Sequence, residues 1–208
     1  MSYSELSEGA RHIVAVFQLA TSQEVQLGLD WYPSARKIAI RMSKVYNISP
    51  YHAAGVISAL SQRNKWEDNV RNAEALAKVY ASGGTVKDLT SVPCRTTHKN
   101  KHQAITILTT PKASPDQILT GPKRHEFYNS IIHPEENDVC IDGHAYSVWL
   151  GEYLPASKAP NIGKRLRIRI KQDYHDATAF INEELGESYI TSDIQAITWV
   201  THKRIHNV

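Results

Sequence analysis

Helix-start signals recur along the chain, and they limit what it can fold into. Ser49-Pro50 places an N-cap residue before a proline, which suits the first turn of a helix, and it precedes the apolar segment HAAGVISALS. Ser192 and Gln195 have the spacing of a capping box. The alternation typical of a β-strand occurs only at residues 166–170, where an exposed basic helix is an equally good interpretation. These signals predict an all-α fold.

Apolar periodicity sets approximate bounds for the predicted helices. The N-terminal segment has the pattern of one amphipathic helix, and Pro33 is expected to open the next one. Further helices are expected to start at Pro50 and Pro115, and a tight break is expected at Gly121. Besides the helices that start at Pro50 and Pro115, the predicted helices cover residues 5–28, 33–46, 66–81, 85–89, 97–109, 126–132, 142–150, 172–185 and 191–206.

Composition favours one compact multi-helix domain over residues 1–208, because 41% of the residues are hydrophobic and 22% are charged, as in ordinary globular proteins. The sequence contains no repeat, no low-complexity linker, no secretory signal and no apolar run of the roughly 18 residues that a membrane span needs. The two cysteines, Cys94 and Cys140, cannot form a four-cysteine zinc or iron–sulfur site. We therefore expect a cytoplasmic protein with no metal, no cofactor and no membrane partner.

Basic residues are concentrated in two stretches, although the net charge is only +3. Residues 95–125 carry six bases and one acid, and a second basic run covers residues 164–171. Such stretches suit a polyanionic partner, and a solvated surface is an equally good interpretation of the charge alone.

Three segments, in order, resemble the helix-hairpin-helix DNA glycosylases, of which the endonuclease III-like enzymes are familiar members. They are VISALSQRNKWEDN at residues 56–69, HKNKHQAITIL at residues 98–108, and the pair ILTGPK and VCIDGH, which end at Lys123 and His144. The similarity is strongest over residues 50–150. The chain is also similar to a narrower, often phage-borne group that shares WYPSA, DGHA and QAITW, so a phage-encoded protein in a host cytoplasm is one expectation.

The resemblance implies two catalytic residues. Asp142 would stabilise the positive charge that develops on the sugar when the bond to the base breaks. An ordinary N-cap aspartate is the other interpretation of its position after an apolar segment. Lys123, 19 positions earlier, could attack the sugar as an amine and add a strand-cleaving lyase step, or could simply contact a phosphate.

The resemblance also implies a set of DNA contacts. In the family, a glutamine that matches Gln62 fills the space left by the extruded base, although a helix end and loop would also explain this segment. The turn at Gly121 would hold a phosphate, and the nearby cations would anchor the backbone. The residues expected to contact DNA are Gln62, Arg63, Asn64, Lys99, Lys101, Gly121, Arg124 and His144.

The hairpin departs from the family pattern. It has the sequence LTGPK in place of the usual LPGVG, and Pro122 removes one amide donor. Taken together, the resemblance implies a DNA N-glycosylase that releases a damaged or modified base flipped out of a duplex. Two alternatives stay open: a glycosylase-fold enzyme that acts in base hypermodification or on nucleotides, and a non-catalytic DNA-binding protein.

Overall fold

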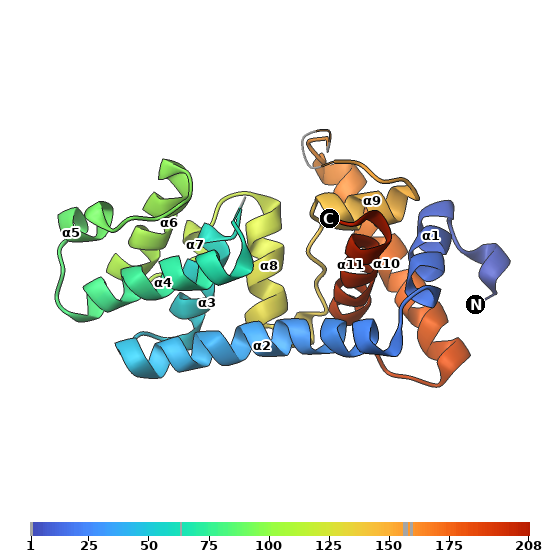
Figure 1. Cartoon of the computed structure of the whole chain (residues 1–208), viewed down its shortest axis with the longest axis horizontal. Helices are drawn as coiled ribbons and strands as arrows, with labels where there is room; N and C mark the ends of the chain where they lie inside the picture. The colour runs from blue at the N-terminus through green and yellow to red at the C-terminus, as the bar shows by residue number, and fades with distance from the viewer. Residues whose placement is uncertain (1, 63, 156–157, 159) are drawn as a thin grey trace. The chain divides into compact units, whose positions relative to one another are not determined.

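The computed structural model describes residues 2–62, 64–155, 158 and 160–208, and in these residues it contains helices and no β-strand. The all-α fold predicted from the sequence is therefore confirmed. No described helix is long and apolar enough to cross a membrane. The helices (Figure 1) are η1 (Tyr3–Glu5), α1 (Glu8–Gln18), α2 (Ser22–Tyr46), α3 (Pro50–Leu60), α4 (Trp66–Ala81), α5 (Val86–Ser91), α6 (His98–Thr109), α7 (Pro115–Ile118), α8 (Pro122–Ile132), η2 (Pro134–Glu136), α9 (Gly143–Leu150), α10 (Lys164–Leu185) and α11 (Thr191–His206).

The chain folds into two compact units. Unit 1 consists of Met1–Pro33 and His133–Val208, and unit 2 consists of Ser34–Ile132. Unit 1 is therefore made of two separate stretches of the chain, whereas unit 2 is one continuous stretch. The assignment of residues 1–208 to a single domain stays a prediction.

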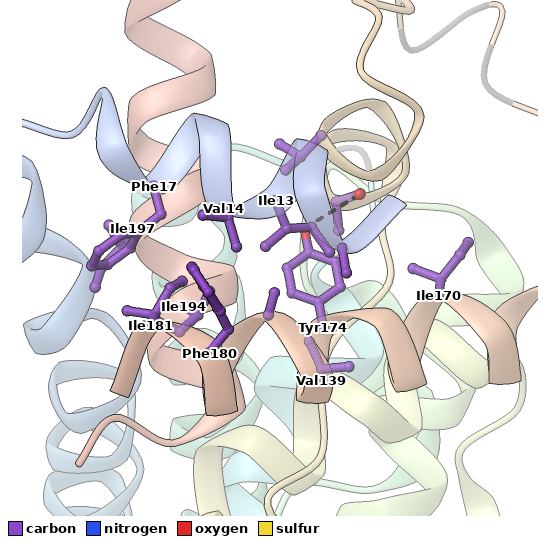
Figure 2. Close-up of a cluster of buried hydrophobic side chains, with 14 of the residues drawn as sticks. Ile13, Val14, Phe17, Val139, Ile170, Tyr174, Phe180, Ile181, Ile194 and Ile197 are labelled. Carbon is purple, nitrogen blue, oxygen red and sulfur yellow. Dashed lines mark hydrogen bonds between the residues drawn. The ribbon is translucent and has the colours of Figure 1, made fainter. Parts of the chain in front are cut away.

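In unit 1, helices α1, α9, α10 and α11 pack against one another. Figure 2 shows how their apolar side chains meet, with α1 lying across the side chains of α10 and α11. Tyr174 is fully buried among them, and its hydroxyl donates to the carbonyl of Ala145 at 3.3 Å. The core consists of Leu6, Ala10, Ile13, Val14, Phe17, Val139, Ile141, Ala145, Val148, Ile170, Tyr174, Ala177, Phe180, Ile181, Ile194 and Ile197.

In unit 2, α3 is the central helix, because every residue from His52 to Leu60 is buried. A helix that is apolar all round is stable only when other elements cover it on every side, and α4, α6, α7 and α8 pack against it. Gly55 permits the close approach of α7, since a Cβ at this position would lie 2.7 Å from the Cβ of Pro115. The start of α3 is as predicted, with the Ser49 hydroxyl accepting from the amide of His52 at 3.1 Å.

Two predicted boundaries near the N-terminus are wrong. Residues 5–28 do not form one helix, because Thr21 and Glu24 make a capping box that starts α2. The Thr21 amide donates to Glu24 Oε2 at 2.8 Å, and the Glu24 amide donates to Thr21 Oγ1 at 3.2 Å. Pro33 lies inside α2 and does not open a helix. A proline here removes one backbone hydrogen bond, and the helix continues through it to Tyr46.

Two further details differ in the C-terminal part of the chain. Helix α10 starts at Lys164, eight residues before the predicted start, and residues 166–170 are helical. Ser192 does not cap α11; the carboxylate of Asp193 accepts the amide of Ile190 at 3.0 Å. Gln195 therefore takes no part in a capping box. Its side chain is buried, and Oε1 accepts a hydrogen bond from the hydroxyl of Tyr32 at 2.7 Å.

Candidate functional site

Asp142 lies in unit 1 at the start of α9, directly after the buried residues 139–141. Its Oδ1 accepts from the backbone amides of His144 at 3.0 Å and Ala145 at 2.9 Å, so the residue is the N-cap of α9. The two amide donors hold this carboxylate at the N-terminal end of the α9 helix dipole. The carboxylate is half-buried, and these contacts hold it in one orientation at the edge of the unit 1 core.

The backbone on both sides of Asp142 is held by α10. Arg167 Nη1 donates to the carbonyl of Ile141 at 3.0 Å, and Tyr174 donates to the carbonyl of Ala145. Burial raises the pKa of the Tyr174 hydroxyl, and the negative charge of Asp142 raises it further. Tyr174 is therefore a neutral hydrogen-bond donor at physiological pH. Its bond to the carbonyl of Ala145 anchors the first turn of α9 to α10.

Three histidine rings and a tyrosine ring lie beside Asp142; we call His144, His202, His206 and Tyr153 the histidine cluster. The Nδ1 atoms of His144 and His202 are 3.3 Å apart. The rings of His202 and His206 lie 4.5 Å apart between centroids, and Tyr153 stacks on His206 at 4.7 Å. His202 is 3% exposed and Tyr153 is 38% exposed, so the cluster extends from the interior of unit 1 to its surface.

His202 is neutral near pH 7. Its pKa is lowered to about 4, because burial disfavours the charged ring and because His206 and His144 lie next to it, while Asp142 acts in the opposite direction. The contact between the two Nδ1 atoms is thus a hydrogen bond in which one ring donates and the other accepts. This bond fixes the ring orientation of His144, which is half-buried two residues after Asp142.

An aromatic pair adjoins the cluster. The Trp199 ring lies 4.9 Å from that of Trp31 and meets the ring of His144 edge-on at 6.2 Å. Lys203 Nζ lies 4.5 Å from the centroid of the Trp199 ring. Flat aromatic rings of this kind are groups on which a nucleobase can stack.

The sequence analysis missed His202, His206 and Tyr153. His202 and His206 are four residues apart on α11 and therefore share one helix face, which is a visible pattern. Their proximity to Asp142 depends on tertiary contacts between α9 and α11, which no local pattern predicts. His144 was the one histidine singled out, and the structure places it in contact with both Trp199 and His202.

Unit 2 brings together several of the other predicted residues around the turn at Gly121. Arg124 donates through Nη1 to Gln62 Oε1 at 3.4 Å and to Asn100, and through Nε to the carbonyl of Thr120 at 2.6 Å. Burial lowers the pKa of Arg124. The guanidinium therefore links α6, α8 and the end of α3, which is a structural task in addition to any contact with phosphate.

The Gly121 turn itself is well defined. Gly121 has φ +90, a conformation that favours glycine, and α8 starts at the next residue. Gln103 fixes the preceding residue, because its Oε1 accepts from the Thr120 amide at 3.0 Å and its Nε2 donates to Thr120 Oγ1 at 2.9 Å. The tight break predicted at Gly121 is confirmed, and its role in binding phosphate stays a prediction.

The other residues predicted to contact DNA differ in whether their side chains are exposed or already bonded within unit 2. Lys101 donates to the carbonyls of Thr90 and Val92 and so closes the end of α5. Lys99 is exposed, and Asn64 donates weakly to the carbonyl of Leu60 at 3.4 Å. Arg63 lies outside the described residues.

The two predicted catalytic residues lie in different units. Lys123 is half-buried in the first turn of α8 in unit 2, and Asp142 is in unit 1. Asp142 is thus accompanied within its own unit by the histidine cluster, whereas Lys123 is accompanied by the Gly121 turn. Among the described residues, no three histidines, cysteines, aspartates or glutamates are arranged to hold a metal ion.

Comparison with known proteins gives one match. No curated protein and no solved structure matches the chain. A family model described as a family of unknown function, DUF7178, matches residues 2–207. Because the match covers both units, the chain belongs to the DUF7178 family.

Proposed function

We propose that this protein is a DNA N-glycosylase that releases a damaged or modified base, with Asp142 as its catalytic carboxylate. The observation that carries the proposal is the fixed carboxylate of Asp142 beside the histidine cluster. Cleavage of an N-glycosidic bond leaves positive charge on the sugar, and a preorganised carboxylate stabilises that charge without reorganising. The resemblance over residues 50–150 supports the same assignment.

The other groups near Asp142 suit an extruded base. His144 is held at Nδ1 by His202, so its ring can orient a substrate in a fixed direction. Tyr153 and Trp199 present aromatic surface on which a base can stack. In the reaction, the bond between the sugar carbon and the base breaks, water adds to that carbon, and a proton passes to the departing base.

Asp142 also caps α9, so the test has to separate catalysis from capping. Asp142→Ser keeps a side-chain acceptor for the helix amides and removes the carboxylate, whereas Asp142→Ala removes both. We expect Asp142→Ser to unfold at nearly the same denaturant concentration as the wild type and to lose base release. Asp142→Ala should lose base release and also about 1 kcal/mol of stability.

The assay uses duplex oligonucleotides that carry one deaminated, oxidised or alkylated base, and it measures the free base together with alkali-labile abasic sites. Base release by the wild type and none by Asp142→Ser would support the proposal. Equal base release by both proteins would remove Asp142 from the chemistry. Tight DNA binding with no base release from any substrate would favour the non-catalytic alternative, and turnover of free nucleotides would favour the nucleotide-acting one.

A further inference from the structure

The first two turns of α10 carry an exposed basic surface. Lys164, Arg165, Ile168 and Arg169 are all exposed and have a spacing that places them on one side of the helix. We call these four residues the α10 basic face. It belongs to unit 1, as Asp142 does.

The basic residues of this helix segment divide into two groups. Arg167 and Lys171 turn inward: Arg167 donates to the carbonyl of Ile141, and Lys171 pairs with Asp138 at 2.5 Å. Lys164 and Arg165, by contrast, make no ion pair or hydrogen bond with any residue that the structure describes. The inward pair holds the segment before Asp142.

The positions of Lys164 and Arg165 at the N-terminal end of α10 lower the stability of this helix. The first turn of α10 contains Lys164, Arg165 and Arg167 and no acidic residue, and its N-cap, Gly163, has no side chain to offer. Positive charge at this end of a helix opposes the helix dipole. Residues that weaken local structure without a compensating contact are commonly functional, and an external anion would offset the repulsion.

We propose that the α10 basic face binds the sugar–phosphate backbone of DNA. Lys164 and Arg169 are separated by about 7.5 Å of helix rise, and one DNA strand advances about 3.4 Å for each phosphate. The face therefore matches about two to three phosphates of one strand. Arg169 is also oriented by Trp149, whose ring centroid lies 5.9 Å from the guanidinium carbon.

An anionic membrane is the main competing partner for a basic helix face. A helix that lies in a membrane surface needs a broad apolar face beside its cations, and here Ile168, 59% exposed, is the single apolar member of the α10 basic face. Because the α10 basic face carries three cations and so little apolar surface, a nucleic-acid backbone is the favoured partner. Binding to an anionic membrane is measured as an alternative outcome of the test.

The α10 basic face is connected to Asp142 through a neighbouring residue of α10. Arg167, on the same turn of α10, donates to the carbonyl of the residue directly before Asp142. The inference rests on the proposed function, because it supplies the surface that would hold the DNA strand while Asp142 acts on one of its sugars. The sequence-based anchors for phosphate are Lys99, Lys101 and Arg124, whereas the α10 basic face lies in the second basic run at residues 164–171 and in the same unit as Asp142.

The test compares two triple variants of the full chain. Lys164→Gln, Arg165→Gln and Arg169→Gln together remove the charge of the α10 basic face. The matched control combines Lys37→Gln, Lys44→Gln and Lys87→Gln, which remove the same charge from exposed positions of unit 2. Affinity for a fluorescein-labelled duplex is measured by anisotropy between about 50 and 200 mM salt. Circular dichroism checks that both variants are folded.

The expected result is specific to the salt dependence. The slope of log K against log[salt] should fall in magnitude by about 2 to 3 in the α10 variant, because each lost phosphate contact contributes about 0.9. Affinity should also fall at least about tenfold at the lower salt concentration. The control variant should change the slope by less than one contact. Equal slopes in the two variants would overturn the inference.

Two further measurements separate the possible failures. Asp142→Ser keeps all three cations of the α10 basic face and removes one negative charge, so it should bind the duplex at least as tightly as the wild type does. If Asp142→Ser still releases base, the proposed function fails while the α10 result stands on its own. If the α10 variant loses binding to phosphatidylserine vesicles and keeps its DNA affinity, the partner is a membrane and the inference is wrong.

Discussion

Protonation of His202 should make unit 1 less stable in mild acid. The ring is 3% exposed, and its pKa is about 4 in the folded protein, below the ordinary value of 6.5. As pH falls below about 6.5 the unfolded chain binds a proton that the folded chain does not, so stability is lost from that point down to about pH 4. Between about pH 7.5 and pH 5.5 the loss from this one residue is about 1 kcal/mol, and the full shift corresponds to about 3 kcal/mol.

The perturbation that isolates this contribution is His202→Asn, which keeps a polar atom near the position of Nδ1. Urea unfolding is followed by tryptophan fluorescence at a series of pH values for the wild type and for the variant. Three of the four tryptophans, Trp31, Trp149 and Trp199, lie in unit 1, so the signal reports mainly on the unit that contains His202. The free energy of unfolding of the wild type should decline relative to that of the variant by about 1 kcal/mol from about pH 7.5 to pH 5.5.

His144, His206, Asp142 and Tyr153 remain in both proteins, so the difference between the two curves reports on position 202 and its contacts with these neighbours. His98→Asn, which removes an exposed histidine of α6, is the matched control and should leave the pH dependence of the wild type unchanged. Parallel stability curves for the wild type and His202→Asn would refute the reasoning, because they would show that the folded and unfolded chains protonate His202 alike.

Three other outcomes are expected. Tyr32→Phe should cost about 1 to 3 kcal/mol in urea unfolding, because it leaves the buried Oε1 of Gln195 without its donor. Gly28→Ala should destabilise by about 1 to 3 kcal/mol in the same assay, since the new Cβ would lie 2.6 Å from backbone atoms of Ile197, and unchanged stability would mean that the two helices can separate freely. If the enzyme also has lyase activity, borohydride should trap a covalent DNA adduct on the wild type and none on Lys123→Arg; an adduct of equal yield on the variant would assign the amine to another lysine.

The local signals in the sequence were sufficient for most helices and for the position of Asp142. Helix α4 covers the predicted residues 66–81, and α9 starts directly after Asp142. Both depend on features that neighbouring residues supply: an apolar period and a closing glycine, and for α9 also the Asp142 cap. Pro33 shows where this fails, because the capping box at Thr21 had already started the helix that passes through it.

The histidine cluster could not be predicted in the same way. His144 and His202 are 58 positions apart, and only the contact between α9 and α11 brings their rings together. The division into two compact units is not marked in the sequence either, because no linker or change of composition occurs at Pro33 or His133. Both features arise from tertiary contacts, which propensities and periodicity do not encode.

The discontinuous course of unit 1 has a consequence for the order in which the protein is made. Unit 2 ends at Ile132, so the ribosome has delivered its whole core before α9, α10 and α11 exist. Helix α1 pairs with those three helices, and until they emerge its apolar face has no partner. During synthesis α1 therefore has to wait for the C-terminal helices before it can pack, and its apolar face is open to a chaperone throughout that interval.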